Sequence, residues 1–101
     1  MEKIGRIALL HDVYGALLTE KQGEALAMFY EEDLSLGEIA EILSISRQAV
    51  YDMIKRSEET LEKYESKVGI LEKDAELRKL LINALESKDW QMIEKAIEKL
   101  N

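Results

Sequence analysis

The sequence predicts an all-α protein, and three observations support this prediction. The 101 residues contain no proline and only five glycines, so little interrupts long helices. Apolar residues recur every three or four positions along most of the chain, the period of a helix buried on one face. Two stretches also have the form of a capping box, which starts helices. A chain of this length, 47% hydrophobic, builds one compact domain with at most a short appendage.

The first two helices follow from apolar spacing and from one capping box. A first helix is expected over residues 4–18, because its apolar residues share one face. Thr19 and Gln22 form a capping box, so a second helix begins there. The expected core-facing residues of these two helices are Ile7, Leu10, Val13, Tyr14, Leu17 and Leu18 in the first, and Ala25, Leu26, Met28, Phe29 and Tyr30 in the second.

The third and fourth helices are separated by a short interruption. Residues 35–38 form the second capping box, and a short helix is expected to start at Leu36. Residues 44–46 interrupt that helix. The fourth helix is expected from Arg47 to about Val68, with Gly69 as the left-handed residue just past its end.

The remaining residues are expected to form a hairpin of two amphipathic helices. These cover residues 74–86 and 88–100, and Ser87 or Asp89 caps the second. Trp90, Ile93, Ile97 and Leu100 are expected to fold back on Leu77, Leu81 and Leu85. The chain thus divides into a domain over residues 1–68 and a C-terminal hairpin extension over residues 69–101.

Residues 36–55 have the pattern of a helix-turn-helix. Two helices that cross through a three-residue turn need a small side chain at their contact, and Ala40 is in that place. Ser46 is a natural N-cap for the second helix. Ser44 departs from the pattern, because glycine is the usual residue at the left-handed position of the turn. The side chains expected to be buried between the helices and the turn are Ile39, Leu43, Ile45, Val50 and Met53.

The chain resembles the YlxM family of small bacterial helix-turn-helix proteins. The resemblance extends from Leu10 to about Tyr64 and is most specific in residues 14–22, 30–41 and 46–56, which read YGALLTEKQ, YEEDLSLGEIAE and SRQAVYDMIKR. It implies an all-helical fold similar to DNA-reading region 4 of sigma factors, without a wing, and a DNA-binding role. Genes of the family commonly lie beside those of signal-recognition-particle GTPases, so the resemblance also implies a regulatory link to that pathway.

A DNA reader of this type would place the N-terminal half of the fourth helix in the major groove. Arg47 would contact guanine and Gln48 adenine, while Asp52 accepts from cytosine. Tyr51 would contact a thymine methyl group or a phosphate. The remaining expected contacts are to phosphate, from the side chains of Lys55 and Arg56 and from backbone N–H groups at Ser35 and Ser46.

The charge of the chain argues against strong nucleic-acid binding. The net charge is −7, and residues 19–67 alone carry 6 basic and 12 acidic side chains. Few phosphates can be neutralised, so binding by one copy would be weak and salt-sensitive. The alternative function is an acidic interaction module that docks on a component of the targeting particle or of RNA polymerase without binding DNA. Residues 31–33, three adjacent acids, are either part of that surface or a solvated loop.

A homodimer would double the contacts to DNA, because readers of this type usually pair half-sites. A heptad-like stripe offers a seam, with members spaced 4-3-4-3-4-3. The alternative is that these residues belong to the core of one chain. The stripe consists of Val50, Ile54, Ser57, Leu61, Tyr64, Val68 and Leu71.

Several function classes are not expected. The chain has no cysteine and one histidine, His11, which is expected to be structural rather than a metal ligand. No catalytic set and no phosphate-binding glycine loop is present, so no enzyme activity and no cofactor is expected. No apolar run reaches the ~20 residues of a membrane helix, and no export signal is recognised, which with the absence of cysteine favours a cytoplasmic protein.

Overall fold

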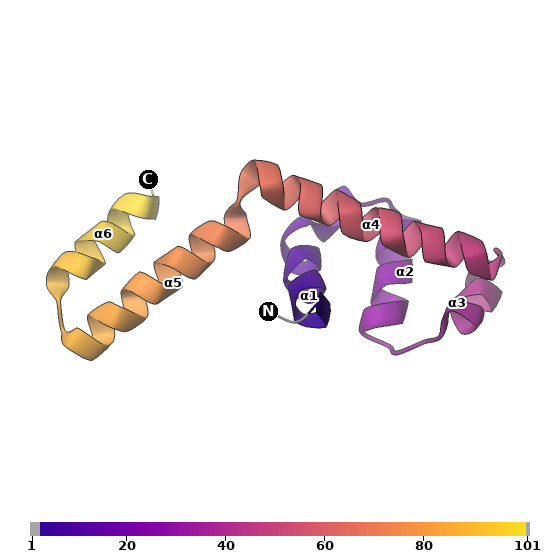
Figure 1. The fold of residues 1–101 in the computed structure, drawn as a ribbon, viewed down its shortest axis with the longest axis horizontal. Coiled ribbons are helices and arrows are strands. Elements are labelled where there is room, and N and C mark those ends of the chain that lie inside the picture. Colours follow the sequence, from indigo (N-terminus) through magenta and orange to yellow (C-terminus); the bar gives the residue numbers. More distant parts are fainter. Residues whose placement is uncertain (1–2, 101) are drawn as a thin grey trace. The chain divides into compact units, whose positions relative to one another are not determined.

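The computed structural model describes residues 3–100, and within that range it confirms the all-α fold. These residues form six α-helices and one 3₁₀ turn, with no β-strand among them. The contacts divide the chain into two units, with the boundary between Val68 and Gly69. The elements, labelled in Figure 1, are α1 (Lys3–Tyr14), η1 (Gly15–Leu17), α2 (Glu20–Tyr30), α3 (Leu36–Leu43), α4 (Arg47–Val68), α5 (Ile70–Ser87) and α6 (Trp90–Leu100).

The N-terminal unit is built on α4, the longest helix. Helices α1, α2 and α3 all pack against it and follow one another along one side of it (Figure 1). The core of the unit is apolar and draws on all four helices. Its buried side chains are Ile7, Leu10, Tyr14, Ala25, Leu26, Ile39, Val50, Ile54 and Leu61.

The expected core face of the first helix is only partly correct. Val13 and Leu17 are exposed to 38% and 59%, although both were expected to face the core. The α-helix ends at Tyr14 and a 3₁₀ turn over residues 15–17 follows, so the α-helical row does not continue to Leu17. Val13 lies at the edge of that row, because its neighbour Tyr14 occupies the buried position.

Both capping boxes are formed as the sequence predicts. The Thr19 Oγ1 accepts a hydrogen bond from the Gln22 N–H at 3.2 Å, and the Gln22 side chain accepts one from the Thr19 N–H at 3.1 Å. Ser35 and Glu38 make the same reciprocal pair at 3.1 and 3.0 Å. Each box satisfies two backbone N–H groups that a helix N-terminus leaves without partners, which fixes where α2 and α3 begin.

The turn of the helix-turn-helix is a Schellman motif that ends α3. Ser44 adopts the left-handed conformation, with φ 56°. The Ile45 N–H donates to the Ala40 carbonyl at 3.1 Å, and the Ser44 N–H donates to the Glu41 carbonyl at 3.4 Å. The residue after Ser44 is the half-buried Ile45, and an apolar residue is common at this position of the motif. The sequence prediction that Ser44 is the left-handed residue is therefore confirmed.

Replacement of Ser44 by glycine is expected to stabilise the protein. A non-glycine residue at φ 56° holds a conformation that costs it about 1 kcal/mol and costs glycine little. The Ser44→Gly variant should raise the free energy of unfolding by about 0.5–1 kcal/mol in urea denaturation. The matched control is Ser66→Gly inside α4, which should lower it by a similar amount. A Ser44→Gly variant as unstable as the control would contradict this account of the turn.

The row of buried residues on α4 contains the first four members of the heptad-like stripe and belongs to the core of the N-terminal unit. Of the other members, Tyr64 is half-buried, Val68 is 47% exposed and Leu71 lies on α5. Val50, Ile54, Ser57 and Leu61 are buried against the other three helices, and the row continues to Glu65. Its spacing of 4-3-4-4 follows a straight helix of 3.6 residues per turn rather than a heptad. The Ser57 hydroxyl is buried without penalty, because it donates to the Met53 carbonyl at 2.7 Å.

The C-terminal unit is the predicted hairpin, with two corrections. Helix α5 begins at Ile70, not at residue 74, because Gly69 with φ 70° turns the chain and the next helix starts at once. Asp89 is the cap of α6, and its side chain accepts from the Gln91 N–H at 3.0 Å. The fully buried residues of the two helices are Ala84 and Ala96, and Leu77 and Ile93 are half-buried. The expected fold-back is therefore only partly correct, because the other members of the two stripes are exposed: Leu81, Leu85, Trp90, Ile97 and Leu100.

Candidate nucleic-acid interface

The N-terminal half of α4 presents a polar, solvent-exposed face. The Ser46 Oγ accepts from the Ala49 N–H at 3.0 Å and so fixes the start of the helix. Arg47 and Gln48 follow in the first turn, and both are exposed. The other exposed side chains that sequence reasoning assigned to this face are Tyr51, Asp52, Lys55 and Arg56. The structure therefore brings all six side chains predicted on α4 to the surface of one half-helix.

Two of these residues are hydrogen-bonded to each other. The Gln48 Nε2 donates to the Asp52 Oδ1 at 3.1 Å, across one turn of helix. This bond uses one of the two amide hydrogens and leaves the Gln48 carbonyl oxygen and the second hydrogen available. Asp52 thereby restricts the orientation of the Gln48 amide, which sequence spacing alone did not specify.

The charges on α4 are segregated along its length. Residues 47–56 carry Arg47, Lys55 and Arg56 against Asp52, whereas residues 57–68 carry two lysines and four glutamates. Within the described residues none of the three cations of the N-terminal half takes part in an ion pair. Their positive charge is therefore available to an external anion.

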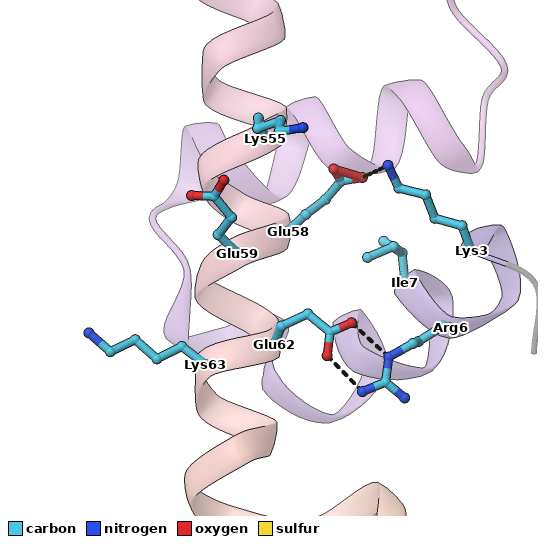
Figure 2. A pocket seen from close by; sticks show the side chains of 8 residues that line it. All are labelled: Lys3, Arg6, Ile7, Lys55, Glu58, Glu59, Glu62 and Lys63. Atoms are coloured by element: carbon cyan, nitrogen blue, oxygen red, sulfur yellow. Dashed lines mark hydrogen bonds and ion pairs between the residues drawn. The ribbon is translucent and has the colours of Figure 1, made fainter.

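Three of the four acids of the C-terminal half have partners inside the N-terminal unit, namely Glu58, Glu62 and Glu65. Arg6 on α1 donates from Nε and from a terminal nitrogen to the two carboxylate oxygens of Glu62, at 2.7 and 2.6 Å. Lys3 lies 3.5 Å from Glu58. Figure 2 shows both pairs crossing the hollow between α1 and α4, with Lys55 near one end of it. These pairs neutralise part of the acidity that argues against nucleic-acid binding.

Two tyrosines complete the polar contacts to α4. The Tyr14 hydroxyl donates to the buried Glu65 carboxylate at 2.7 Å, and the Tyr30 hydroxyl donates to Glu58. Burial and then the contact with Glu58 raise the pKa of Tyr30 above its ordinary value. Sequence reasoning missed this network. The signal that could have found it is the spacing of Glu58, Glu62 and Glu65, which places three carboxylates beside the buried row of α4.

The ion pair between Arg6 and Glu62 makes stability depend on pH. The hydrogen bond from Arg6 lowers the pKa of Glu62 below its ordinary value of 4.5. A carboxyl group with a lowered folded-state pKa contributes stability above the unfolded pKa and loses it as the pH falls through the folded pKa. We therefore expect the urea midpoint to fall as the pH drops below 4.5.

The Arg6→Gln variant tests this pH dependence. It should lower the free energy of unfolding at pH 7 by no more than about 1 kcal/mol, because both side chains are partly exposed. The variant should also lose less stability than the wild type as the pH falls into the acid range. The Lys63→Gln control removes a charge from α4 that belongs to neither ion pair with α1 and should keep the wild-type profile. Identical profiles for Arg6→Gln and wild type would contradict the assignment.

The two serines at helix N-termini differ as candidate phosphate contacts. The backbone N–H of Ser35 already donates to the Glu38 carboxylate, so a phosphate there would displace a negative charge of the protein. Hydrogen bonds from Ser35 lower the pKa of Glu38, which keeps that carboxylate ionised. This geometry disfavours the expected contact at Ser35. Ser46 has no acidic residue in the first turn of its helix and fits an anion better.

The remaining sequence candidates are structural or solvent-exposed. The His11 imidazole packs on Gly15, where an added Cβ would lie 2.4 Å from the ring, and no group of metal-ligating side chains exists within residues 3–100. Residues 31–33 are exposed between α2 and α3. In the part of the chain that the structure describes, no helix is long and apolar enough to cross a membrane.

Comparison with known proteins places these features in a family. The family model described as "Putative helix-turn-helix protein, YlxM / p13 like" matches residues 1–100. A UPF0122 protein of Clostridium botulinum is 42% identical over an alignment of 109 positions that covers 99% of this chain and 100% of the relative. One from Caldanaerobacter subterraneus is 58% identical over 73 residues, 72% of this chain and 62% of the relative. One from Listeria welshimeri is 54% identical over 79 residues, 78% of this chain and 72% of the relative.

Proposed function

This chain belongs to the YlxM / p13-like family of helix-turn-helix proteins, and from that premise we propose that it is a DNA-binding regulatory protein. One observation carries the proposal. The N-terminal half of α4, the second helix of the helix-turn-helix, exposes three cations that form no ion pair within the described residues. A helix in this position of the motif enters the major groove with its first turns toward the base edges.

The proposed contacts divide into base readers and phosphate contacts. Arg47 offers a bidentate fork to guanine, and Gln48, oriented by Asp52, offers its free oxygen and second hydrogen to adenine. Tyr51 is 47% exposed and reaches a thymine methyl group or a phosphate. Lys55, Arg56 and the N-terminus at Ser46 bind phosphates and set the register of the helix.

A salt titration of DNA binding tests the proposal. Fluorescence anisotropy with a mixed-sequence duplex at about 50 and 200 mM salt measures the slope of log affinity against log salt, which counts neutralised phosphates. On a mixed-sequence duplex Arg47 also contacts phosphate, so together with Lys55 and Arg56 it gives three cations that predict a slope of about −2.7 per copy, a loss of roughly 40-fold over this range. Structured RNA as competitor should displace the duplex poorly. No binding at low salt, or preference for RNA, would contradict the proposal.

The second candidate is an acidic docking module without DNA binding. It is favoured by the exposed acids of residues 31–33 and by the net charge of −7, which attract a basic partner. The partner would be a component of the targeting particle or of RNA polymerase. The regulatory link to the signal-recognition-particle pathway rests on the family resemblance alone and is proposed with either function.

Charge reversal separates the two candidates. Reversal of residues 31–33 to lysine should abolish docking on a basic partner and leave DNA binding unchanged or strengthened. A DNA reader should instead respond to changes at Arg47. If neither change alters binding to any tested partner, both candidate functions are excluded.

A further inference from the structure

The hairpin of α5 and α6 carries a large apolar face that nothing in its own unit covers. We define the hairpin face as Leu81, Leu85, Trp90, Ile97 and Leu100. Leu85, Trp90 and Leu100 are exposed to 80%, 74% and 70%. Monomeric soluble proteins expose single apolar residues freely, but a contiguous patch of this kind marks an interaction surface.

The helical period places these five residues on the same side of the hairpin. The two helices meet through Ala84 and Ala96, both buried. Leu81 and Leu85 lie one turn apart on α5, and Trp90, Ile97 and Leu100 lie within one stripe of α6. In each helix, the exposed stripe is rotated away from the buried alanine in the same direction when that helix is viewed along its own chain. Because the two helices run antiparallel (Figure 1), this rotation places both stripes on the same side of the hairpin.

The size of the hairpin face fits a second copy of the same face. With maximal areas of roughly 180 Å² for Leu or Ile and 250 Å² for Trp, the five exposed fractions amount to about 600 Å² per copy and about 1,200 Å² for two. Specific stable interfaces begin at about 1,200 Å². Residues that flank the face, such as Ile82, would add to this area.

The charge and size of the hairpin also favour self-association. Residues 69–101 carry six basic and seven acidic side chains, so two copies approach without net repulsion, whereas a strongly charged partner gains little here. Two helices in about 30 residues cannot bury a core of their own, since units below about 40 residues usually need a disulfide, a bound metal or a partner chain to be stable. Two hairpins packed face to face supply that core as a four-helix bundle.

We propose that the hairpin face is the homodimer interface of this protein and that two hairpins form an antiparallel four-helix bundle about a two-fold axis. The first four residues of the seam that the sequence suggested are core, so we place the dimer on α5 and α6 instead. The partner copy would bring a second α4 to a DNA site, which doubles the few phosphate contacts that one copy makes. The interface itself does not depend on the proposed DNA binding.

Sedimentation of the full-length chain without DNA tests the dimer. Wild type should be a dimer at about micromolar concentration, as interfaces of this size allow. The Leu85→Glu variant should raise the dimer dissociation constant at least about 30-fold, because the dimer would bury an unpaired carboxylate, while its circular dichroism stays helical. The matched control Gln91→Glu adds the same charge at an exposed position of α6 outside the hairpin face and should remain a dimer.

A thiol-protection measurement decides the outcome if Leu85→Glu disturbs folding. The chain has no cysteine, so Leu85→Cys introduces a single thiol, and its alkylation should slow as the protein concentration rises and the dimer buries the hairpin face. The Gln91→Cys control should react at a rate that does not depend on protein concentration. A wild type that stays monomeric at 100 µM, with or without binding to anionic vesicles, would overturn the proposal, as would a dimer that survives Leu85→Glu. None of these results decides whether α4 binds DNA, which the salt titration tests separately.

Discussion

The Arg47→Glu variant is expected to lose about 10- to 100-fold in affinity for duplex DNA. Arg47 is exposed at the first position of α4 and forms no ion pair within the described residues, so reversal of its charge removes an external contact rather than an internal one. A bidentate contact from arginine to guanine discriminates by about 1–3 kcal/mol, and reversal adds repulsion from the phosphates. Anisotropy titrations at one fixed salt concentration measure the loss.

The fold of this variant is expected to remain intact. A glutamate in the first turn interacts favourably with the helix dipole, so the urea midpoint should stay the same or rise slightly. The Lys63→Glu control makes the same change of net charge on the exposed C-terminal half of α4 and should weaken binding less than about threefold at moderate salt. Equal losses for both variants would show that net charge alone governs binding.

The Leu61→Ala variant is expected to have the largest effect on stability. Leu61 is fully buried in the row of α4 that packs on the other helices of the N-terminal unit. Truncation of a buried leucine costs about 2–5 kcal/mol, because it removes apolar contacts and leaves a cavity. That is a large part of the total stability of a small domain, so thermal and urea unfolding should both shift strongly.

A matched leucine on α1 provides the control for this change. Leu9 is 43% exposed, and Leu9→Ala should cost less than about 1 kcal/mol. The same pair of variants tests whether the α4 row is core or dimer seam. A Leu61→Ala protein that dissociates into monomers but unfolds at the wild-type midpoint would contradict the assignment to the core.

Local features of this fold were predictable because their signals are local. The capping boxes at Thr19 and Ser35, the left-handed Ser44 and the whole extent of α4 each depend on a few adjacent residues. Each of these predictions is confirmed. The start of α5 was predicted too late, because residues 70–73 lack a cap of their own and Gly69 serves both helices.

Features that depend on contacts distant in sequence were not predictable. The pair of Arg6 with Glu62 joins residues 56 positions apart, and the sequence around either residue gives no indication of its partner. Apolar spacing likewise identified the stripe of α4 but could not say whether its partner is α1 or a second chain. On α6 the spacing marked the stripe of Trp90, Ile93, Ile97 and Leu100, yet only Ile93 of these is half-buried and the fully buried residue is Ala96.

The arrangement of the expected DNA-contacting residues was predictable from the sequence only in part. Their exposure on the first turns of α4 follows from local helix spacing, and the structure agrees. The hydrogen bond between Gln48 and Asp52 is also local, at four residues apart, although spacing did not fix its geometry. What the spacing could not show is that Glu58 and Glu62 of the same helix are paired with residues of α1 and α2.

Mapping of backbone amide shifts during titration with a mixed-sequence duplex tests the central claim most directly. Nitrogen–proton correlation spectra of the full chain at about 50 mM salt report every backbone N–H that a bound phosphate or base perturbs. The account predicts that the largest changes fall in residues 46–56, with smaller ones in the preceding turn. Changes confined to residues 31–33 or to the hairpin face, or no changes at saturating DNA, would contradict it.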